Sequence, residues 1–196
     1  SIIHGETPIN FLNKLQAVRY CVNQHVLHTA EEMRLKGRII GKFIPISPTT
    51  KLPRPADADT NPESNLAWRR AMAESHNADR INFKRSVRTR TQLEAANKFK
   101  DDVFYLCWSF DYRGRAYPIP AFLTPQDTDF GKALLRFADE SSVTDEAELW
   151  LSFQVATTYG LDKETLEDRH QWVSKNTDLI TKVATDPVRY LSEWEE

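Results

Sequence analysis

Hydrophobic residues recur every three or four positions over much of the chain, which predicts a mainly α-helical protein. From Ile9 to Gly37 this spacing predicts one long helix. A second helix is expected to begin at Asn61-Pro62, because Asn is a favoured N-cap and Pro fits the first helical position. Its pattern loosens around His76-Asn77 and resumes from Thr91 to Phe99. Two long helices joined by a proline-rich loop would form a long helical hairpin.

The period changes between Val103 and Ile119. Residues 103–108 are rich in β-formers and predict a short strand, and residues 116–119 predict a second one. Gly114 lies between them and allows a tight turn. The expected element is a two-stranded β-hairpin.

A helical pattern returns after this hairpin and continues to the last residue. Thr128 or Asp129 is expected to cap a helix that buries Leu134 and Phe137, together with Ala133 and Ala138. Four more helices complete a predicted helical bundle. Their expected starts are Asp145 (in a capping box with Glu148), Asp162, the region before Leu179, and Asp186-Pro187, and Gly160 is the expected end of the first.

Composition places the chain among soluble globular proteins, with 40% hydrophobic and 28% charged residues. No apolar run approaches the roughly 20 residues that cross a bilayer. Cys21 and Cys107 lie in apolar patterns and are expected to be buried, reduced thiols. The net charge of −2 conceals an asymmetry: residues 1–100 hold 17 Lys and Arg against 9 Asp and Glu, and residues 101–196 hold 9 against 19. This asymmetry suggests that one half of the chain faces a polyanion.

The basic residues are densest in the second half of the second helix, where no acid lies between Arg80 and Arg90. Intrahelical ion pairs therefore cannot account for the whole run. Either the run is a solvated helix face or it contacts phosphates, in which case binding should weaken steeply with salt. The candidate residues are Arg80, Lys84, Arg85, Arg88 and Arg90.

The turn of the predicted hairpin carries a second basic group, Arg113 and Arg115. A two-residue period would place both side chains on one face, and Asp111 could orient one guanidinium. An ordinary surface hairpin with solvated arginines is the alternative interpretation.

Asp111-x-x-Gly114-Arg115, followed by Tyr117, resembles the Asp-x-x-Gly-Arg motif of the single-subunit, phage-type RNA polymerases, a family of phage and mitochondrial enzymes. The flanking sequences agree in order. They are Asn61-Pro62-Glu63, Ala67-Trp68-Arg69-Arg70-Ala71, Ala95-Ala96-Asn97-Lys98-Phe99, Pro125-Gln126 and Lys132-x-Leu134-Leu135. The resemblance spans most of the chain and is weakest before Leu12 and near residue 50.

The resemblance implies an organisation in two parts. Residues 1–101 would hold the end of an N-terminal region and the thumb, a helical arm that leans on the product hybrid. Residues 102–196 would hold the start of the palm. We therefore expect a piece of a DNA-directed RNA polymerase that contacts template DNA and the RNA–DNA hybrid. The catalytic aspartates and the fingers would lie beyond Glu196, so this piece would be inactive alone and would hold no metal.

By the same resemblance, the remainder of the polymerase would be a partner, the full-length enzyme would use magnesium, and no membrane would be involved. The compartment would be the cytoplasm of an infected host or the mitochondrial matrix. Asp111 would hold the turn or an arginine. The expected nucleic-acid contacts are Arg113, Gly114, Arg115, Tyr117, Lys132, Lys84, Arg85, Arg88 and Arg90.

Three other interpretations follow from the residues. The chain could be a self-standing helical adaptor that binds a protein through its acidic half. It could be a metal-dependent nuclease if Asp111, Asp127 and Asp129 converged. His25 and His28 share a face of the first predicted helix, but two histidines supply only half a metal site, so solvated histidines are favoured.

Overall fold

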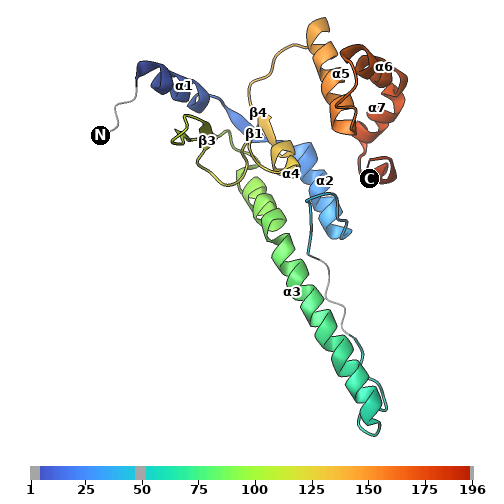
Figure 1. Ribbon diagram of the computed structural model, residues 1–196. Helices are drawn as coiled ribbons and strands as arrows, with labels where there is room; N and C mark the ends of the chain where they lie inside the picture. Colours follow the sequence, from blue (N-terminus) through green and yellow to red (C-terminus); the bar gives the residue numbers. More distant parts are fainter. Residues whose placement is uncertain (1–4, 47–51, 195–196) are drawn as a thin grey trace. The chain divides into compact units, whose positions relative to one another are not determined.

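The computed structural model describes residues 5–46 and 52–194, and its helices and strands are labelled in Figure 1. The chain forms two compact units, the first ending at Ala138 and the second beginning at Asp139. Most of the described backbone is helical, which confirms the mainly α class. The division predicted at residue 101 separates the thumb from the start of the palm and does not describe compact units, so it stays a prediction.

The first expected helix is interrupted. Helix α1 (Glu6–Gln16) and helix α2 (Gln24–Leu35) are separated by strand β1 (Tyr20–Val22), so the single helix predicted from Ile9 to Gly37 is wrong. Tyr20 exchanges two backbone hydrogen bonds of 2.9 Å with Phe104, and β1 pairs with strand β4 (Leu135–Phe137). Pairing with residues distant in the sequence thus overrides the local helical spacing. Val22 does not distinguish the two structures, because it fits a strand as well as a helix.

Helix α3 (Pro62–Phe99) is a single helix of 38 residues, about 57 Å long at 1.5 Å per residue. The expected N-cap is confirmed, since Asn61 Oδ1 accepts the backbone N–H of Glu63 and of Ser64. The looser pattern at His76-Asn77 does not break the helix. The first helix of the predicted hairpin is only the 12 residues of α2, which pack near the C-terminal end of α3.

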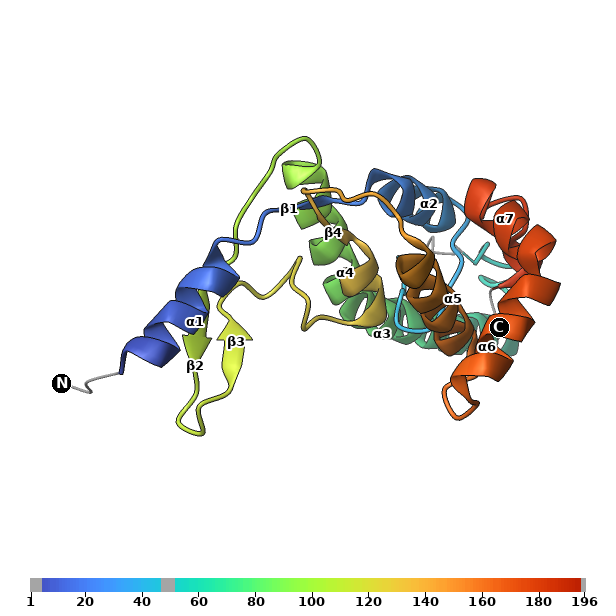
Figure 2. The ribbon, with the colours of Figure 1, turned by 90° about the horizontal axis from the view of Figure 1, so that it is seen from above.

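The β-hairpin of the turn region is confirmed, although it is shorter than predicted. Strand β2 (Trp108–Phe110) pairs antiparallel with strand β3 (Ala116–Pro118), in the register Trp108↔Pro118. The upstream residues expected in the same strand do not join it, because Phe104 bridges to Tyr20 instead. Helix α1 lies beside this hairpin (Figure 2), where the Phe11 and Phe110 rings stack at 6.0 Å.

The helix after the hairpin is also shorter than expected. Helix α4 (Asp129–Ala133) has five residues, is capped by Thr128, and gives way to β4. Leu134 is fully buried, as predicted, but Phe137 is 63% exposed, which corrects its expected place in the core. Pairing with β1 ends the helix there, because Leu135 and Phe137 join the ladder.

The core of the first unit gathers where α2, the end of α3 and the small β1–β4 sheet meet. Aromatic rings form a chain of contacts from Phe99 to Phe104 and Tyr20, and on to Phe137. The buried hydrophobic residues here include Val22, Leu27, Ala30, Met33, Leu93, Ala96, Leu106 and Leu134.

The second unit is helical. It contains α5 (Asp145–Tyr159), α6 (Leu166–Lys175), α7 (Thr177–Thr185) and a 3₁₀ turn at Leu191–Glu193. Gly160 ends α5 in the left-handed conformation (φ +117°), as expected. Thr144 and Thr165 cap α5 and α6, so Asp145 and Asp162 are not the N-caps. Asp186-Pro187 opens turns followed by the 3₁₀ segment, and the predicted α-helix there does not form.

The thiols and the apolar segments give two further outcomes. Cys21 is half-buried, but Cys107 is exposed, which corrects the expectation that both are buried. Among the described residues, no helix combines the length and apolar character needed to span a membrane.

Candidate nucleic-acid interface

The loop between β2 and β3 runs from residue 111 to residue 115, and its tip, residues 112–114, is a three-residue turn closed by Asp111 and Arg115. Gly114 N–H donates to the Asp111 carbonyl at 3.0 Å, and Asp111 N–H donates to the Arg115 carbonyl at 2.9 Å. Gly114 has φ +77°, the left-handed conformation that follows a type I turn in a three-residue hairpin loop. Glycine adopts this conformation without strain, so residue 114 suits a tight, exposed tip.

Asp111 holds this turn with both carboxylate oxygens. Its Oδ1 accepts the backbone N–H of Arg113 (2.9 Å) and of Arg115 (3.0 Å), and its Oδ2 accepts Arg115 Nε (2.8 Å) and Nη2 (2.7 Å). The backbone N–H of Arg115 and then its guanidinium lower the pKa of Asp111 below its ordinary value. An ionised Asp111 therefore presents Arg115 in a fixed direction.

The two arginines occupy different parts of the hairpin. Arg113 lies inside the turn, and Arg115 adjoins β3, so the strand period that was expected to align them does not apply. Arg113 lies over the Tyr112 ring (5.2 Å), and Arg115 lies over the Tyr117 ring (5.5 Å). Tyr112 is 88% exposed. Exposed cation–aromatic pairs can contact phosphates and stack on bases.

Lys132 lies in the last turn of the five-residue helix α4. Its Nζ forms an ion pair of 2.9 Å with Asp129 Oδ1, one turn earlier. This hydrogen bond and the charge of Lys132 lower the pKa of Asp129. A lysine in the last turn of a helix suits the helix dipole, the chain itself supplies an anion beside it, and Lys132 stays exposed.

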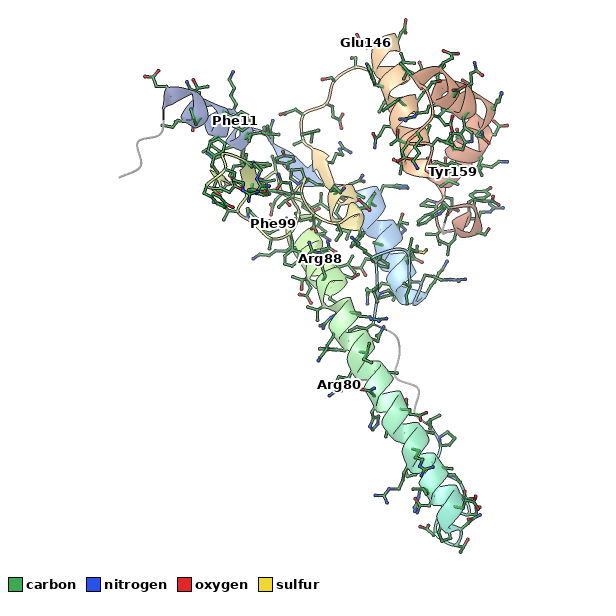
Figure 3. The ribbon with its side chains drawn as sticks, in the orientation of Figure 1. Phe11, Arg80, Arg88, Phe99, Glu146 and Tyr159 are labelled. Carbon is green, nitrogen blue, oxygen red and sulfur yellow. The ribbon has the colours of Figure 1, made fainter. Side chains whose placement is uncertain are left out.

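Four of the five predicted basic residues of α3 are exposed: Arg80, Lys84, Arg85 and Arg88. At about 100° per residue they fall within an arc of about 140°. Arg90 falls outside this arc, beyond the stripe that α3 buries. Figure 3 shows Arg80 and Arg88 along the length of the helix.

Arg88 and Arg90 have partners within the chain. Arg88 Nη2 contacts Asp127 Oδ1 at 2.5 Å and also lies 5.8 Å from the Phe122 ring. Arg90 is half-buried and lies 4.4 Å from the Phe83 ring. The structure therefore separates these two residues from the freely exposed Lys84 and Arg85.

The three acids of the nuclease interpretation do not converge. Asp111 pairs with Arg115, Asp127 pairs with Arg88, and Asp129 pairs with Lys132. Within residues 5–46 and 52–194, no three His, Cys, Asp or Glu side chains are grouped so that they could hold a metal ion. His25 and His28 are both exposed on α2.

Sequence reasoning missed the contacts by which Asp127 joins α3 to α4. The sequence indicates Thr128 or Asp129 as a cap, and Asp127 only as part of a possible metal motif. The overlooked signal is Gly131, a glycine inside a short helix. A Cβ there would lie 2.3 Å from Asp127 Cγ and 2.7 Å from Gln92 Nε2, so the glycine makes room for a buried carboxylate.

Comparison with known proteins supplies the family. A family model described as DNA-dependent RNA polymerase matches residues 141–196. T7 RNA polymerase of Escherichia phage T7 is 30% identical over 179 residues, covering 90% of this chain and 20% of the phage protein. The DNA-directed RNA polymerase of Enterobacteria phage T3 is 29% identical over 184 residues, with the same coverage.

A mitochondrial DNA-directed RNA polymerase of Neurospora crassa is 26% identical over 183 residues, covering 93% of this chain and 13% of that protein. The chain thus spans a fifth or less of the length of these relatives. The matches extend through the Asp-x-x-Gly-Arg turn and both units. By these similarities the chain belongs to the family of single-subunit, phage-type DNA-directed RNA polymerases.

Proposed function

We propose that this chain is the segment of a DNA-directed RNA polymerase that contacts the template DNA and the RNA–DNA hybrid. The names of the relatives support the enzyme class. The resemblance further supports the assignment of α3 to the thumb and of the β2–β3 hairpin to the opening of the palm.

The observation that carries the proposal is the arginine turn. Arg113, Gly114 and Arg115 are exposed at the tip of the hairpin, and Asp111 fixes the backbone that bears them. Ordering these side chains before binding lowers the entropy lost on contact with a phosphate. Tyr117 beside Arg115 adds an aromatic face for a base or sugar.

A second contact is proposed along α3, where Arg80, Lys84 and Arg85 share one exposed side. Each residue that neutralises a phosphate releases a counterion, so binding should weaken as salt rises. Lys132 is a further proposed contact, because phosphate could replace Asp129 as the anion beside its ammonium group.

We propose that these residues bind nucleic acid but do not themselves catalyse nucleotide transfer. Asp111, Asp127 and Asp129 each form an ion pair with a different basic side chain. In the full-length enzyme, magnesium ions held by palm aspartates would clamp the reacting oxygens, as two-metal sites do.

Fluorescence anisotropy with a short labelled RNA–DNA hybrid tests the proposal. The chain should bind the hybrid at low salt and release it as salt rises, and Arg115→Ala should weaken binding by about tenfold. Lys163→Ala, which removes an exposed lysine of the second unit, is the matched control and should leave the affinity unchanged. Equal affinities of wild type and Arg115→Ala would refute the role of the turn.

A second test uses the whole polymerase. Arg115→Ala in the full-length enzyme should leave promoter binding largely intact and reduce transcript synthesis and hybrid stability. Unchanged elongation by this variant would contradict the assignment.

One observation favours the alternative function, a helical adaptor. Leu151, Val155 and Tyr159 follow one another at four-residue steps on α5, and all three are exposed. Such a stripe suits a protein partner. No binding to the hybrid at low salt, with the chain monomeric, would favour the adaptor over the polymerase segment.

A further inference from the structure

Helix α3 packs against the core of the first unit only near its C-terminal end. Its buried residues all lie in that last third, while the residues from Pro62 to Arg85 are exposed or half-buried and extend away from the core (Figure 1). The buried residues are Ser86, Thr89, Gln92, Leu93 and Ala96.

Among the polar contacts of this anchored part, three link residues 88–92 to segments outside the helix. Thr89 Oγ1 accepts the backbone N–H of Ile44 at 3.0 Å. Gln92 Nε2 donates to Thr128 Oγ1 at 2.9 Å, and Arg88 Nη2 contacts Asp127 Oδ1 at 2.5 Å. Two of the three contacts therefore end on adjacent residues immediately before α4, the helix that carries Lys132.

Asp127 is suited to fix the position of the Arg88 side chain and not merely to neutralise its charge. Its side chain is 0% exposed, its Oδ1 also accepts the Thr128 N–H at 2.7 Å, and its Oδ2 faces Gly131. A buried carboxylate is costly unless it is paired, so the position of Arg88 is tightly determined by that of Asp127. The Arg88 side chain remains 54% exposed, and its guanidinium also lies over the Phe122 ring.

The length of the arm amplifies any change at this contact. The 24 residues from Pro62 to Arg85 extend about 36 Å beyond the anchor at 1.5 Å per residue. A tilt of about 10° at the anchor would move the far end by roughly 6 Å, which is more than one helical turn.

We infer that Arg88 and Asp127 form a latch that sets the direction of α3 relative to the segment carrying Lys132. The latch makes Arg88 a positioning residue, which acts on nucleic acid through the placement of Lys84 and Arg85. This functional consequence rests on the proposed function; the latch itself does not.

Amide hydrogen exchange of the whole chain tests the latch without any ligand. Arg88→Gln and Asp127→Asn should each increase exchange in residues 86–96 and 128–134 by at least about threefold, because either change breaks the same contact. The double variant should add little to either single variant, as expected for residues that act as a unit. Arg85→Gln, the matched change one turn earlier, should leave exchange in both segments as in the wild type.

Unchanged exchange in Arg88→Gln, or fully additive effects in the double variant, would overturn the latch. For the same variants, the salt dependence of hybrid binding then distinguishes a positioning role from direct contact with phosphate. Arg85→Gln should reduce the slope of log affinity against log salt concentration by about one, whereas Arg88→Gln should lower the affinity at an unchanged slope.

A reduced slope for Arg88→Gln would mean that Arg88 contacts phosphate directly, which contradicts the positioning role. A chain that binds no hybrid in any form would refute the proposed function, and hydrogen exchange would still decide whether the latch exists.

Discussion

Asp111 and Arg115 face each other across the neck of the β2–β3 turn, and one carboxylate binds both the backbone and the guanidinium of its partner. The Oδ2–Nη2 distance is 2.7 Å, and Oδ1 accepts the Arg115 N–H at 3.0 Å. The acid of the family motif thus organises the arginine that follows it, by local contacts within five residues.

This relationship predicts the effect of Asp111→Asn on hybrid binding. Charge alone predicts tighter binding, because the change removes a carboxylate next to a polyanion. Organisation of the turn predicts weaker binding, by about threefold to tenfold, because the ion pair that orders Arg115 is lost. Anisotropy titration distinguishes the two, and we expect weaker binding.

Asp102→Asn is the control for that measurement, since it removes an exposed carboxylate of the same unit. It should leave binding unchanged or strengthen it slightly. An Asp111→Asn variant that binds as tightly as Asp102→Asn would show that the turn does not need its acid.

The pH dependence of the turn has a definite sign. The N–H groups and guanidinium of Arg115 lower the pKa of Asp111 in the folded chain. Asp111 therefore stabilises the fold above its unfolded pKa of about 3.9, and this contribution is lost as pH falls through the folded value. Titration of the Asp111 carboxyl by NMR should give a lower pKa than the same residue in an unstructured peptide. An equal or higher pKa would contradict the hydrogen bonding described above.

Gly131→Ala is expected to destabilise the first unit. The new Cβ would lie 2.3 Å from Asp127 Cγ, and that side chain cannot move without losing Arg88 and the Thr128 N–H. We expect a loss of about 1–3 kcal/mol in the free energy of unfolding, measured by urea denaturation.

The same substitution in an Asp127→Ala background provides the control. Without the carboxylate the remaining close contact of the residue 131 Cβ is Gln92 Nε2, the end of a flexible side chain, so Gly131→Ala should cost less there. Equal costs in both backgrounds would show that Asp127 is not the reason for the glycine.

Arg169 is expected to be the main polar support of the second unit. It is 6% exposed, its Nη1 donates to Thr157 Oγ1 and its Nη2 to the Asp162 carbonyl, and its guanidinium lies 4.3 Å from the Phe153 ring. Arg169→Ala should lower the free energy of unfolding of this unit by about 2 kcal/mol, since two partly buried acceptors lose their donor and the Phe153 ring loses its contact.

Urea unfolding followed by tryptophan fluorescence measures this loss, because the Trp172 ring contacts the Tyr159 ring at 4.3 Å within the unit. Lys175→Ala, on the same helix but exposed, should change stability by less than about 0.5 kcal/mol. Arg169→Lys should not restore stability, since an ammonium cannot bond at two places and stack at once. Full rescue by lysine would contradict the proposed geometry.

Local chemistry explains most of what could be predicted. The Asn61 cap, the Gly160 stop and the Gly114 turn each depend on a few neighbouring residues, and the structure has all three. Where prediction was wrong, the cause is a distant partner. Tyr20 pairs with Phe104 and Phe137, and no local pattern could show that these pairings would end two helices.

The same distinction applies to the candidate interface. The motif from Asp111 to Arg115 could be identified from the sequence, because its contacts lie within one turn. The run from Arg80 to Arg90 was treated as one basic group, and the structure divides it: Arg88 reaches Asp127, 39 residues away, and Arg90 lies against Phe83.

The sequence by itself determined the mainly helical class, the ends of the long helix, the arginine turn and the family, because each of these is written in short-range patterns. The tertiary structure alone decided where the helices stop for β1 and β4, and which arginines stay exposed. The physical reason is that strand pairing and ion pairing join residues far apart in the chain, and their energy appears only when folding brings those residues together.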